Sequence, residues 1–251
     1  MQLYPADLHI HTALSPCAAD EMTPPAIVQT ARKRGLAMIA VCDHNSADNT
    51  AAAQAAARAA DRAVAVLAGV EITTAEEVHV VGLFPAPQAA EAAAAELTAT
   101  LPPADEAYYA RFGPQRWLDA EGRERGAEPH MLALATGFDL AGAVALVHRH
   151  GGLAIAAHVN RPSFSVLSQL GFFPADAGFD ALEVFTPAGV AVDEAAAVAA
   201  AAHGLPVLAS SDSHTLGDIG RARSVFTLAA PTFEEVALAL RGAAGRGVRC
   251  A

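Results

Sequence analysis

Residue types that bind metals occur near the ends of several short apolar runs in this chain. The first run, within YPADLHIHT, carries Asp7, His9 and His11 at alternate positions. Side chains two positions apart on a strand point to the same face, so both imidazoles can reach one ion. The same residue types recur near later runs: Asp43 with His44, Glu71, His79, His158, Glu183, and Asp212 with His214.

Imidazoles and carboxylates gathered in one pocket suit Zn, Mn or Fe. A carboxylate such as Glu71 can bridge two ions, which can then polarise a phosphoryl oxygen and supply hydroxide near neutral pH. A single histidine of this set is more often an ordinary core or surface residue. The recurrence of ligand-type residues at run after run is what favours a metal centre.

The elements that must position these residues alternate between apolar runs and helical stretches. The runs cover residues 6–11, 36–43, 63–72, 78–84, 153–159, 181–185 and 206–210. Helices are expected from Thr23 and its two following prolines to Arg34, over about 47–62, 88–100 and 139–150, and after the capping box at Thr232. This alternation predicts βαβ units and a mainly parallel α/β sheet, with the site at the C-terminal ends of the strands.

Composition limits the class of protein. The 251 residues, 53% of them hydrophobic, suffice for a single domain over 1–251. A net charge of −11 argues against a nucleic-acid polymer or an anionic membrane as partner. An odd number of cysteines, no room for a signal peptide before Asp7 and no membrane-length apolar run predict a cytoplasmic protein.

Residues 86–138 interrupt the alternation. A polar, turn-rich stretch with the chain's only tryptophan follows an Ala/Glu-rich helix, and QRWLDAEGRERG predicts a small hairpin. We interpret 86–138 as an insertion over the barrel rim. Its aromatic residues Tyr108, Tyr109 and Trp117 either contact substrate or anchor the insertion to the barrel.

The motifs DLHIHT, DHN, GVEIT, HVVGLF, AAHVNRP and SSDSHT occur in this order between Asp7 and His214. As a spaced set they resemble the polymerase and histidinol phosphatase (PHP) superfamily, over most of the chain. The resemblance implies a distorted (βα)7 TIM-like barrel, here with an inserted subregion. It also implies two or three divalent metal ions (Zn, Mn or Fe) and hydrolysis of phosphate esters.

The resemblance also assigns roles by position. One ion would be bound by His9, His11, Glu71 and Asp212, a second by Glu71, His79 and His158, and a third by His44 and His214. Catalytic roles would fall to Glu71, Asp43, His214 and Arg161. Of these, Asp43 would orient a histidine or water, and Arg161 would stabilise charge on a phosphate unless it forms only a surface salt bridge.

One position departs from the family pattern. Relatives place an Asp five or a His six residues after the second His of the first motif, where this chain has Pro16 and Cys17. A Cys17 thiolate would complete the third ion's site and favour Zn or Fe. The alternatives are a buried Cys17 that closes a turn while Asp20 or Glu21 reaches the metal, or a site with only two ions.

The expected function is a metal-dependent phosphoesterase that hydrolyses a small phosphorylated metabolite or nucleotide through a metal-bridging hydroxide. The alternatives are a metal-dependent exonuclease, an amidohydrolase-like hydrolase of another bond, and a non-catalytic metal-binding module. Near-complete retention of the ligands argues against the last, because unused buried ionisable clusters are costly. The sequence leaves the substrate and the oligomeric state open.

Overall fold

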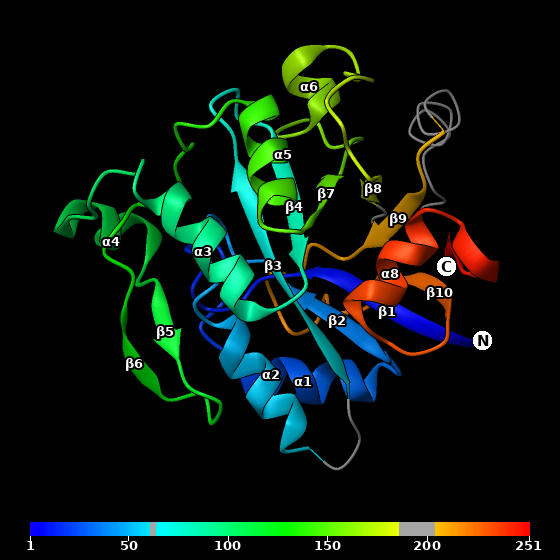
Figure 1. Cartoon of the computed structure of the whole chain (residues 1–251). Coiled ribbons are helices and arrows are strands. Elements are labelled where there is room, and N and C mark those ends of the chain that lie inside the picture. Colours follow the sequence, from blue (N-terminus) through cyan, green and yellow to red (C-terminus); the bar gives the residue numbers. More distant parts are fainter. Residues whose placement is uncertain (61–63, 186–203) are drawn as a thin grey trace.

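The computed structural model describes residues 1–60, 64–185 and 204–251. Nine strands form one nearly closed sheet in the order β11-β10-β1-β2-β3-β4-β7-β8-β9, with helices packed outside it (Figure 1). The strands are β1 (Gln2–Ile10), β2 (Met38–Val41), β3 (Ala65–Thr73), β4 (His79–Phe84), β7 (Leu153–Ala156), β8 (Ala181–Phe185), β9 (Val207–Ser210), β10 (Ser224–Leu228) and β11 (Gly247–Cys250). The expected α/β, TIM-like barrel is confirmed.

Strand β4 runs against its neighbours, which corrects the expectation that the ligands follow the C-terminal ends of strands. Strands β1, β2 and β3 are parallel, as are β7, β8 and β9, but β4 is antiparallel to both β3 and β7. His79 is the first residue of β4 and pairs with Thr73 at the end of β3. The reversal brings the start of β4 to the rim where its neighbours end, so His79 still reaches that rim.

The sheet closes at the same rim, between the ends of β1 and β9. The backbone N–H of His11 donates to Ser213 O at 3.0 Å, and Ser213 N donates to His9 O at 3.3 Å. Closure therefore occurs at the very residues that carry the two imidazoles of the first motif.

Strands β10 and β11 were missed by the sequence analysis. Strand β10 pairs antiparallel with β1, from Gln2 opposite Leu228 to Ala6 opposite Ser224, and β11 pairs with β10. Ser224 and Thr227 break up the apolar character of β10, and β11 is only four residues long. Both strands were therefore weak signals, and tertiary pairing with β1 stabilises them.

Helices cover the outside of the sheet (Figure 1): α1 (Pro24–Lys33), α2 (Thr50–Arg58), α3 (Pro87–Thr98), α5 (Leu140–Arg149), α6 (Val166–Leu170) and α8 (Phe233–Leu240). Helix α1 begins after Thr23 as expected, but the Thr23 side chain makes no capping hydrogen bond, so the two prolines set the start. Helix α2 is shorter than the expected 47–62, and the last two residues of that range, 61 and 62, lie outside the described part. Among the described helices, none is long and apolar enough for a membrane crossing.

Alternation along β4 shows how the strands divide the core. Val81 and Leu83 belong to a cluster with Phe226 of β10 and Val236 of α8. Val80 and Phe84 instead pack with residues of α3 and α5 on the outer face. His79 shares the face of Val81 and Leu83, so it points to the inside of the barrel at the rim.

The segment after α3 forms helix α4 (Glu106–Phe112) and the expected hairpin of β5 (Arg116–Leu118) and β6 (Glu124–Ala127), which lie to one side of the barrel (Figure 1). Asn49, before α2, fastens the hairpin. Its Nδ2 donates to Arg116 O at 3.0 Å, and its Oδ1 accepts from Leu118 N at 2.8 Å. The hairpin is thus held against the loops near the rim.

Gly69 in β3 leaves no room for a side chain. A Cβ there would lie 2.5 Å from Cys42 Sγ and 2.9 Å from Val41 O. We expect Gly69→Ala to lower the free energy of unfolding by about 1–3 kcal/mol, a usual cost of overpacking. Gly217→Ala, whose new Cβ would meet only Thr215 Oγ1 at 3.7 Å, is the control in urea and thermal unfolding. Equal midpoints for the two variants would contradict the close packing.

Candidate metal centre

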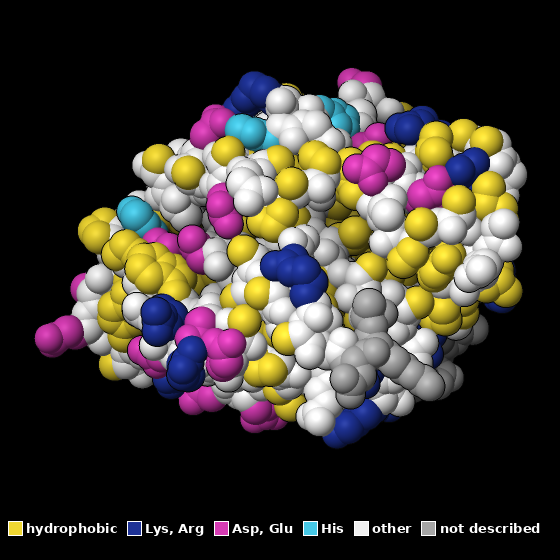
Figure 2. Space-filling model, turned by 60° about the horizontal axis from the view of Figure 1, so that its bottom comes forward, with side chains coloured by type: hydrophobic (Ala, Val, Ile, Leu, Met, Phe, Trp, Pro, Cys, Tyr) yellow, Lys and Arg dark blue, Asp and Glu magenta, His cyan; other side chains and the backbone are white. Residues whose placement is uncertain are grey.

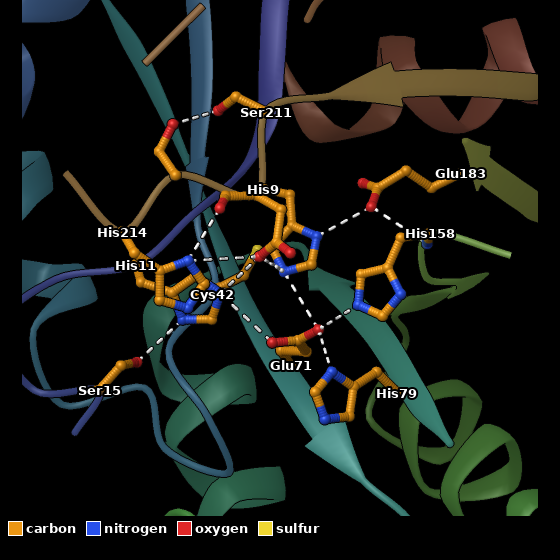
Figure 3. Close-up of polar contacts among 12 residues, drawn as sticks. His9, His11, Ser15, Cys42, Glu71, His79, His158, Glu183, Ser211 and His214 are labelled. Carbon is orange, nitrogen blue, oxygen red and sulfur yellow. Dashed lines mark hydrogen bonds and ion pairs between the residues drawn. The ribbon is translucent and has the colours of Figure 1, made fainter. Parts of the chain in front are cut away.

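The carboxylate of Glu71 lies at the centre of a group of imidazoles (Figure 3). The Glu71 side chain is 1% exposed. Its Oε1 atom lies 2.7 Å from His79 Nδ1, 3.1 Å from His158 Nε2 and 3.4 Å from His9 Nε2. Its Oε2 atom lies 3.1 Å from His44 Nδ1 and 3.3 Å from His11 Nε2. Residues distant in sequence therefore converge on one carboxylate, whereas the sequence predicted only that they would share one pocket.

Asp212 is the second carboxylate of the cluster. Its Oδ1 lies 3.2 Å from His11 Nε2 and 3.5 Å from His9 Nε2. Both Asp212 and His158 have positive φ, 50° and 27°, which residues other than glycine rarely adopt. Such strain persists where the surrounding structure fixes it, often at functional sites. Here it turns two side chains from the loops after β9 and β7 towards the centre.

Asp7, the first polar residue of the opening motif, fastens one of these loops. Its Oδ1 accepts from Ser211 N at 2.9 Å, and its Oδ2 accepts from Gly220 N at 2.8 Å. Burial raises the pKa of this carboxyl to about 6, against the hydrogen bonds from Ser211. Asp7 thus holds the loop that carries Asp212 and does not itself reach the centre.

Hydrogen bonds set the tautomers of His9 and His11. Ser15 Oγ has one proton, and it donates this proton to Asp43 Oδ1 at 2.7 Å, since a carboxylate only accepts. Ser15 Oγ must then accept from His11 Nδ1, 2.9 Å away. His9 Nδ1 similarly donates to Glu183 Oε1 at 3.0 Å. In their neutral forms both rings would therefore direct the lone pair of Nε2 at the centre, as metal ligation requires.

Several buried polar atoms at the centre lack a hydrogen bond. They are His9 Nε2, His44 Nδ1, Glu71 Oε2 and His79 Nδ1. Buried polar atoms are normally paired, so unpaired atoms that face one another fit a site for cations. Three groups of side chains have ligand atoms within 4.8 Å of one another: His9, His11, Glu71 and Asp212; His44, Glu71 and His79; and His11, His44 and His214. The donor set suits Zn, Mn or Fe.

The charges of the cluster are coupled. Burial disfavours an ionised Glu71, but His79 and His9 hold the pKa of this carboxyl well below its usual range. Burial also works against a charged His11, yet its contacts with Asp212 and Glu71 raise its pKa to about 9. Burial lowers the pKa of His214 to about 4. An ion that binds at neutral pH must therefore displace a proton from His11.

The remaining residues singled out from the sequence lie around this centre. Asp43 is fully buried behind His11 and accepts from Thr12 as well as Ser15. Arg161 pairs with Asp212 Oδ2, and its guanidinium carbon lies 5.3 Å from the centre of the Phe185 ring.

Cys17 lines the same pocket as His44 and His214 but belongs to none of the three ligand groups, so its ligation stays a prediction. The two acidic alternatives are on the surface: Asp20 lies 3.4 Å from Arg116 Nη2, and Glu21 is exposed.

A pocket of about 340 Å³ opens above the centre. His44, Glu71, His79, Asp212 and His214 form its floor, and Pro16, Cys17, Thr73, Phe112, Ala133, Arg161 and Phe164 surround them. The sequence analysis did not single out Phe112 or Phe164. Phe112 ends helix α4 within the 86–138 segment, and Phe164 follows the AAHVNRP motif by two residues. That proximity to a motif was the available signal for Phe164.

The aromatic residues named from the sequence have mainly an anchoring role. Tyr108 is 5% exposed, and its hydroxyl donates to Gln115 Oε1 at 2.7 Å. The Tyr109 hydroxyl donates to Glu128 O at 2.8 Å. Trp117, in β5, packs against the buried cluster of Leu14, Leu101 and Leu132. None of these three lines the pocket above the metal centre, whose described aromatic neighbours are Phe112 and Phe164.

The chain belongs to the PHP domain family, whose model matches residues 7–169. A second model, described as PHP-associated, matches residues 194–244. The matched residues include the His, Glu and Asp side chains that converge in the structure and could hold metal ions. A search among curated proteins found no significant match.

Solved structures show the same fold at low identity. The lesion-specific endonuclease of Pyrococcus furiosus is 19% identical, with a TM-score of 0.69 over 98% of this chain and 58% of its own length. A candidate metal-dependent phosphoesterase from Bifidobacterium adolescentis is 22% identical, with a TM-score of 0.58 over 84% of this chain and 88% of that one. An amidohydrolase from Chromobacterium violaceum with bound sulfate and no metal is 25% identical, with a TM-score of 0.59 over 86% of this chain and 89% of that one. This chain spans little more than half of the endonuclease.

Removing the Ser15 hydroxyl should weaken metal binding. Ser15→Ala would leave His11 Nδ1 without its acceptor, and loss of such a supporting hydrogen bond typically costs about 10–100-fold in metal affinity. Zinc affinity would be measured by competition with a chromophoric chelator. Thr98→Ala, which removes a hydroxyl bonded to Ala94 O in α3, is the control. Equal zinc affinities for the two variants would show that Ser15 does not orient His11.

Metal should stabilise the fold through Glu71. A ligand that binds only the folded state at about 1,000 times its Kd adds about 4 kcal/mol. We therefore expect zinc to raise the melting temperature of chelator-treated protein in scanning calorimetry. Glu71→Gln should lose most of this increase, because an amide cannot offset the charge of the ions. An equal zinc-induced increase in both proteins would place the bound ions elsewhere.

Proposed function

We propose that this protein is a phosphoesterase that hydrolyses a small phosphorylated metabolite or nucleotide, in the simplest case a phosphomonoester. The observation that carries the proposal is the Glu71 carboxylate, shared by two ligand groups at the floor of a pocket of about 340 Å³. Divalent ions bound there would polarise a phosphoryl oxygen and lower the pKa of a water molecule.

The ligand groups refine the assignment made from the family motifs. His44 Nδ1 lies 3.1 Å from Glu71 Oε2, so His44 would contribute to the ion held by Glu71 and His79 as well as to the one held with His214. His158 Nε2, 3.1 Å from Glu71 Oε1, would add a donor beside His79. His11 belongs to two of the groups. Shared ligands of this kind would keep the ions close together.

Arg161 and Asp43 would act from different sides of the centre. The Arg161 guanidinium lines the pocket, stacks on Phe185 and would bind phosphate oxygens through its fork of donors. Asp43 is fully buried and hydrogen-bonded, so we propose that it positions His11 through Ser15 and does not contact substrate.

Pocket size and charge favour a small substrate over a polymer. Pockets for small molecules span roughly 300–1,000 Å³, and this pocket falls within that range. The net charge of −11 opposes the approach of a nucleic-acid backbone. On the face drawn in Figure 2, the described Lys and Arg side chains are scattered and several stand beside Asp or Glu.

Cleavage of a nucleic-acid backbone is the second candidate. It is supported by the likeness of 98% of the chain to the lesion-specific endonuclease. A solved complex of Endonuclease Q with a 27-mer duplex substrate has an abasic lesion at that enzyme's active site. At 19% sequence identity, this similarity supports a shared fold but not a shared substrate.

The protein loaded with Mn or Zn should release inorganic phosphate from a panel of phosphomonoesters. Glu71→Ala and His158→Ala should each lower kcat/KM by at least about 100-fold, because each leaves an ion with fewer ligands. His148→Ala is the matched control, since His148 is exposed and pairs with Asp180 away from the pocket.

The same panel would include a duplex with an abasic site and a simple amide. Activity that survives complete removal of metal by a chelator would contradict the proposed chemistry. Cleavage of the duplex or the amide without phosphate release from any monoester would favour the corresponding alternative.

A further inference from the structure

The pocket lining combines ionisable and apolar residues. Besides the ligand residues of the floor and Arg161, it contains Phe112, Ala133, Pro16 and Phe164. A phosphate would be held by the ligand groups at the floor and by Arg161 beside them. The part of the substrate that remains above the floor would then contact apolar side chains.

Phe164 has an unfavourable backbone conformation beside the pocket. Its φ is 57°, a region unfavourable for a bulky residue, and it is 38% exposed. Its ring stacks on His79, with centroids 4.7 Å apart and planes at 21°. Its carbonyl accepts from His79 N at 2.9 Å. A strained backbone that presents an aromatic ring to the pocket points to a functional use.

Phe112 is held in place from behind. Its ring centroid lies 4.9 Å from that of Tyr108, which is 5% exposed. The Tyr108 hydroxyl donates to Gln115 and accepts from Ala133 N at 3.0 Å. The 86–138 segment therefore fixes Phe112 and Ala133 together on the pocket. A fixed apolar surface loses little conformational entropy when a ligand binds.

We propose that the substrate is a phosphate ester whose alcohol part carries a flat aromatic ring, which packs against Phe112 and Phe164 while the phosphate binds at the floor. This inference rests on the proposed phosphoesterase function and adds the class of substrate. Phe164 is already stacked on His79, so a planar ring can extend the stack at the exposed part of Phe164. Aromatic pairs gain stability beyond the burial of area, so a flat ring is favoured over a saturated one of similar size.

The test compares benzyl, cyclohexylmethyl and ethyl phosphate. All three release a primary alcohol, so leaving-group chemistry differs little among them. We expect kcat/KM to be about tenfold higher for benzyl than for cyclohexylmethyl phosphate, with ethyl phosphate lowest. The difference should lie mainly in KM, since the ring is remote from the reacting bond.

Leucine variants distinguish the effect of the aromatic ring from the effect of apolar bulk at the same position. Phe164→Leu and Phe112→Leu keep an apolar side chain and should reduce the benzyl preference, taken as the ratio of kcat/KM for the two esters within each variant, to about twofold or less. Phe172→Leu is the control, because Phe172 is 62% exposed and does not line the pocket. Melting temperatures of all variants would verify that each is folded. An unchanged benzyl preference in both pocket variants would overturn the proposal.

Binding of non-hydrolysable analogues separates this inference from the proposed function. Benzylphosphonate should bind the metal-loaded protein about tenfold more tightly than cyclohexylmethylphosphonate in titration calorimetry. If no phosphate ester is hydrolysed but this binding preference appears, the phosphoesterase function fails and the aromatic site stands. If esters are hydrolysed with no preference for benzyl in either assay, the aromatic site fails and the function stands.

Discussion

The buried carboxylate of Glu71 is the constraint on which the rest of the molecule depends. An isolated carboxylate at 1% exposure would be very costly, so it must be surrounded by groups that favour its charge. The imidazoles that do so come from β1, β4 and the loops after β2 and β7. No single element can supply them, so the centre forms only when the sheet is curved and nearly closed.

Two features of the barrel serve this convergence. The reversal of β4 presents His79 from the start of a strand, and the backbone bonds between His11 and Ser213 close the sheet beside the centre. Behind the ligands, three buried carboxylates have two different roles. Glu183 and Asp43 set imidazole tautomers, directly or through Ser15, while Asp7 holds the loop of Asp212. Loss of these outer groups would leave the ligand side chains in place but poorly oriented for metal binding.

Under the proposed function, the centre and the segment around it would divide the work of recognition. Metal-ligand residues of this kind are shared by hydrolases of one family, whereas substrate choice rests with the loops that surround them. Here the 86–138 segment is anchored by Tyr108, Tyr109 and Asn49, and it brings Phe112 and Ala133 to the pocket.

The sequence by itself determined the class of fold and much of the centre. Alternating apolar runs predicted the α/β barrel, and ligand residues at their ends predicted that His9, His11, Glu71 and Asp212 would meet, because both signals are local. Only the tertiary structure decided the direction of β4, the presence of β10 and β11, the sharing of His44 between two ligand groups and the place of Phe112 and Phe164. These depend on pairing and packing between segments far apart in the chain, which local spacing does not encode.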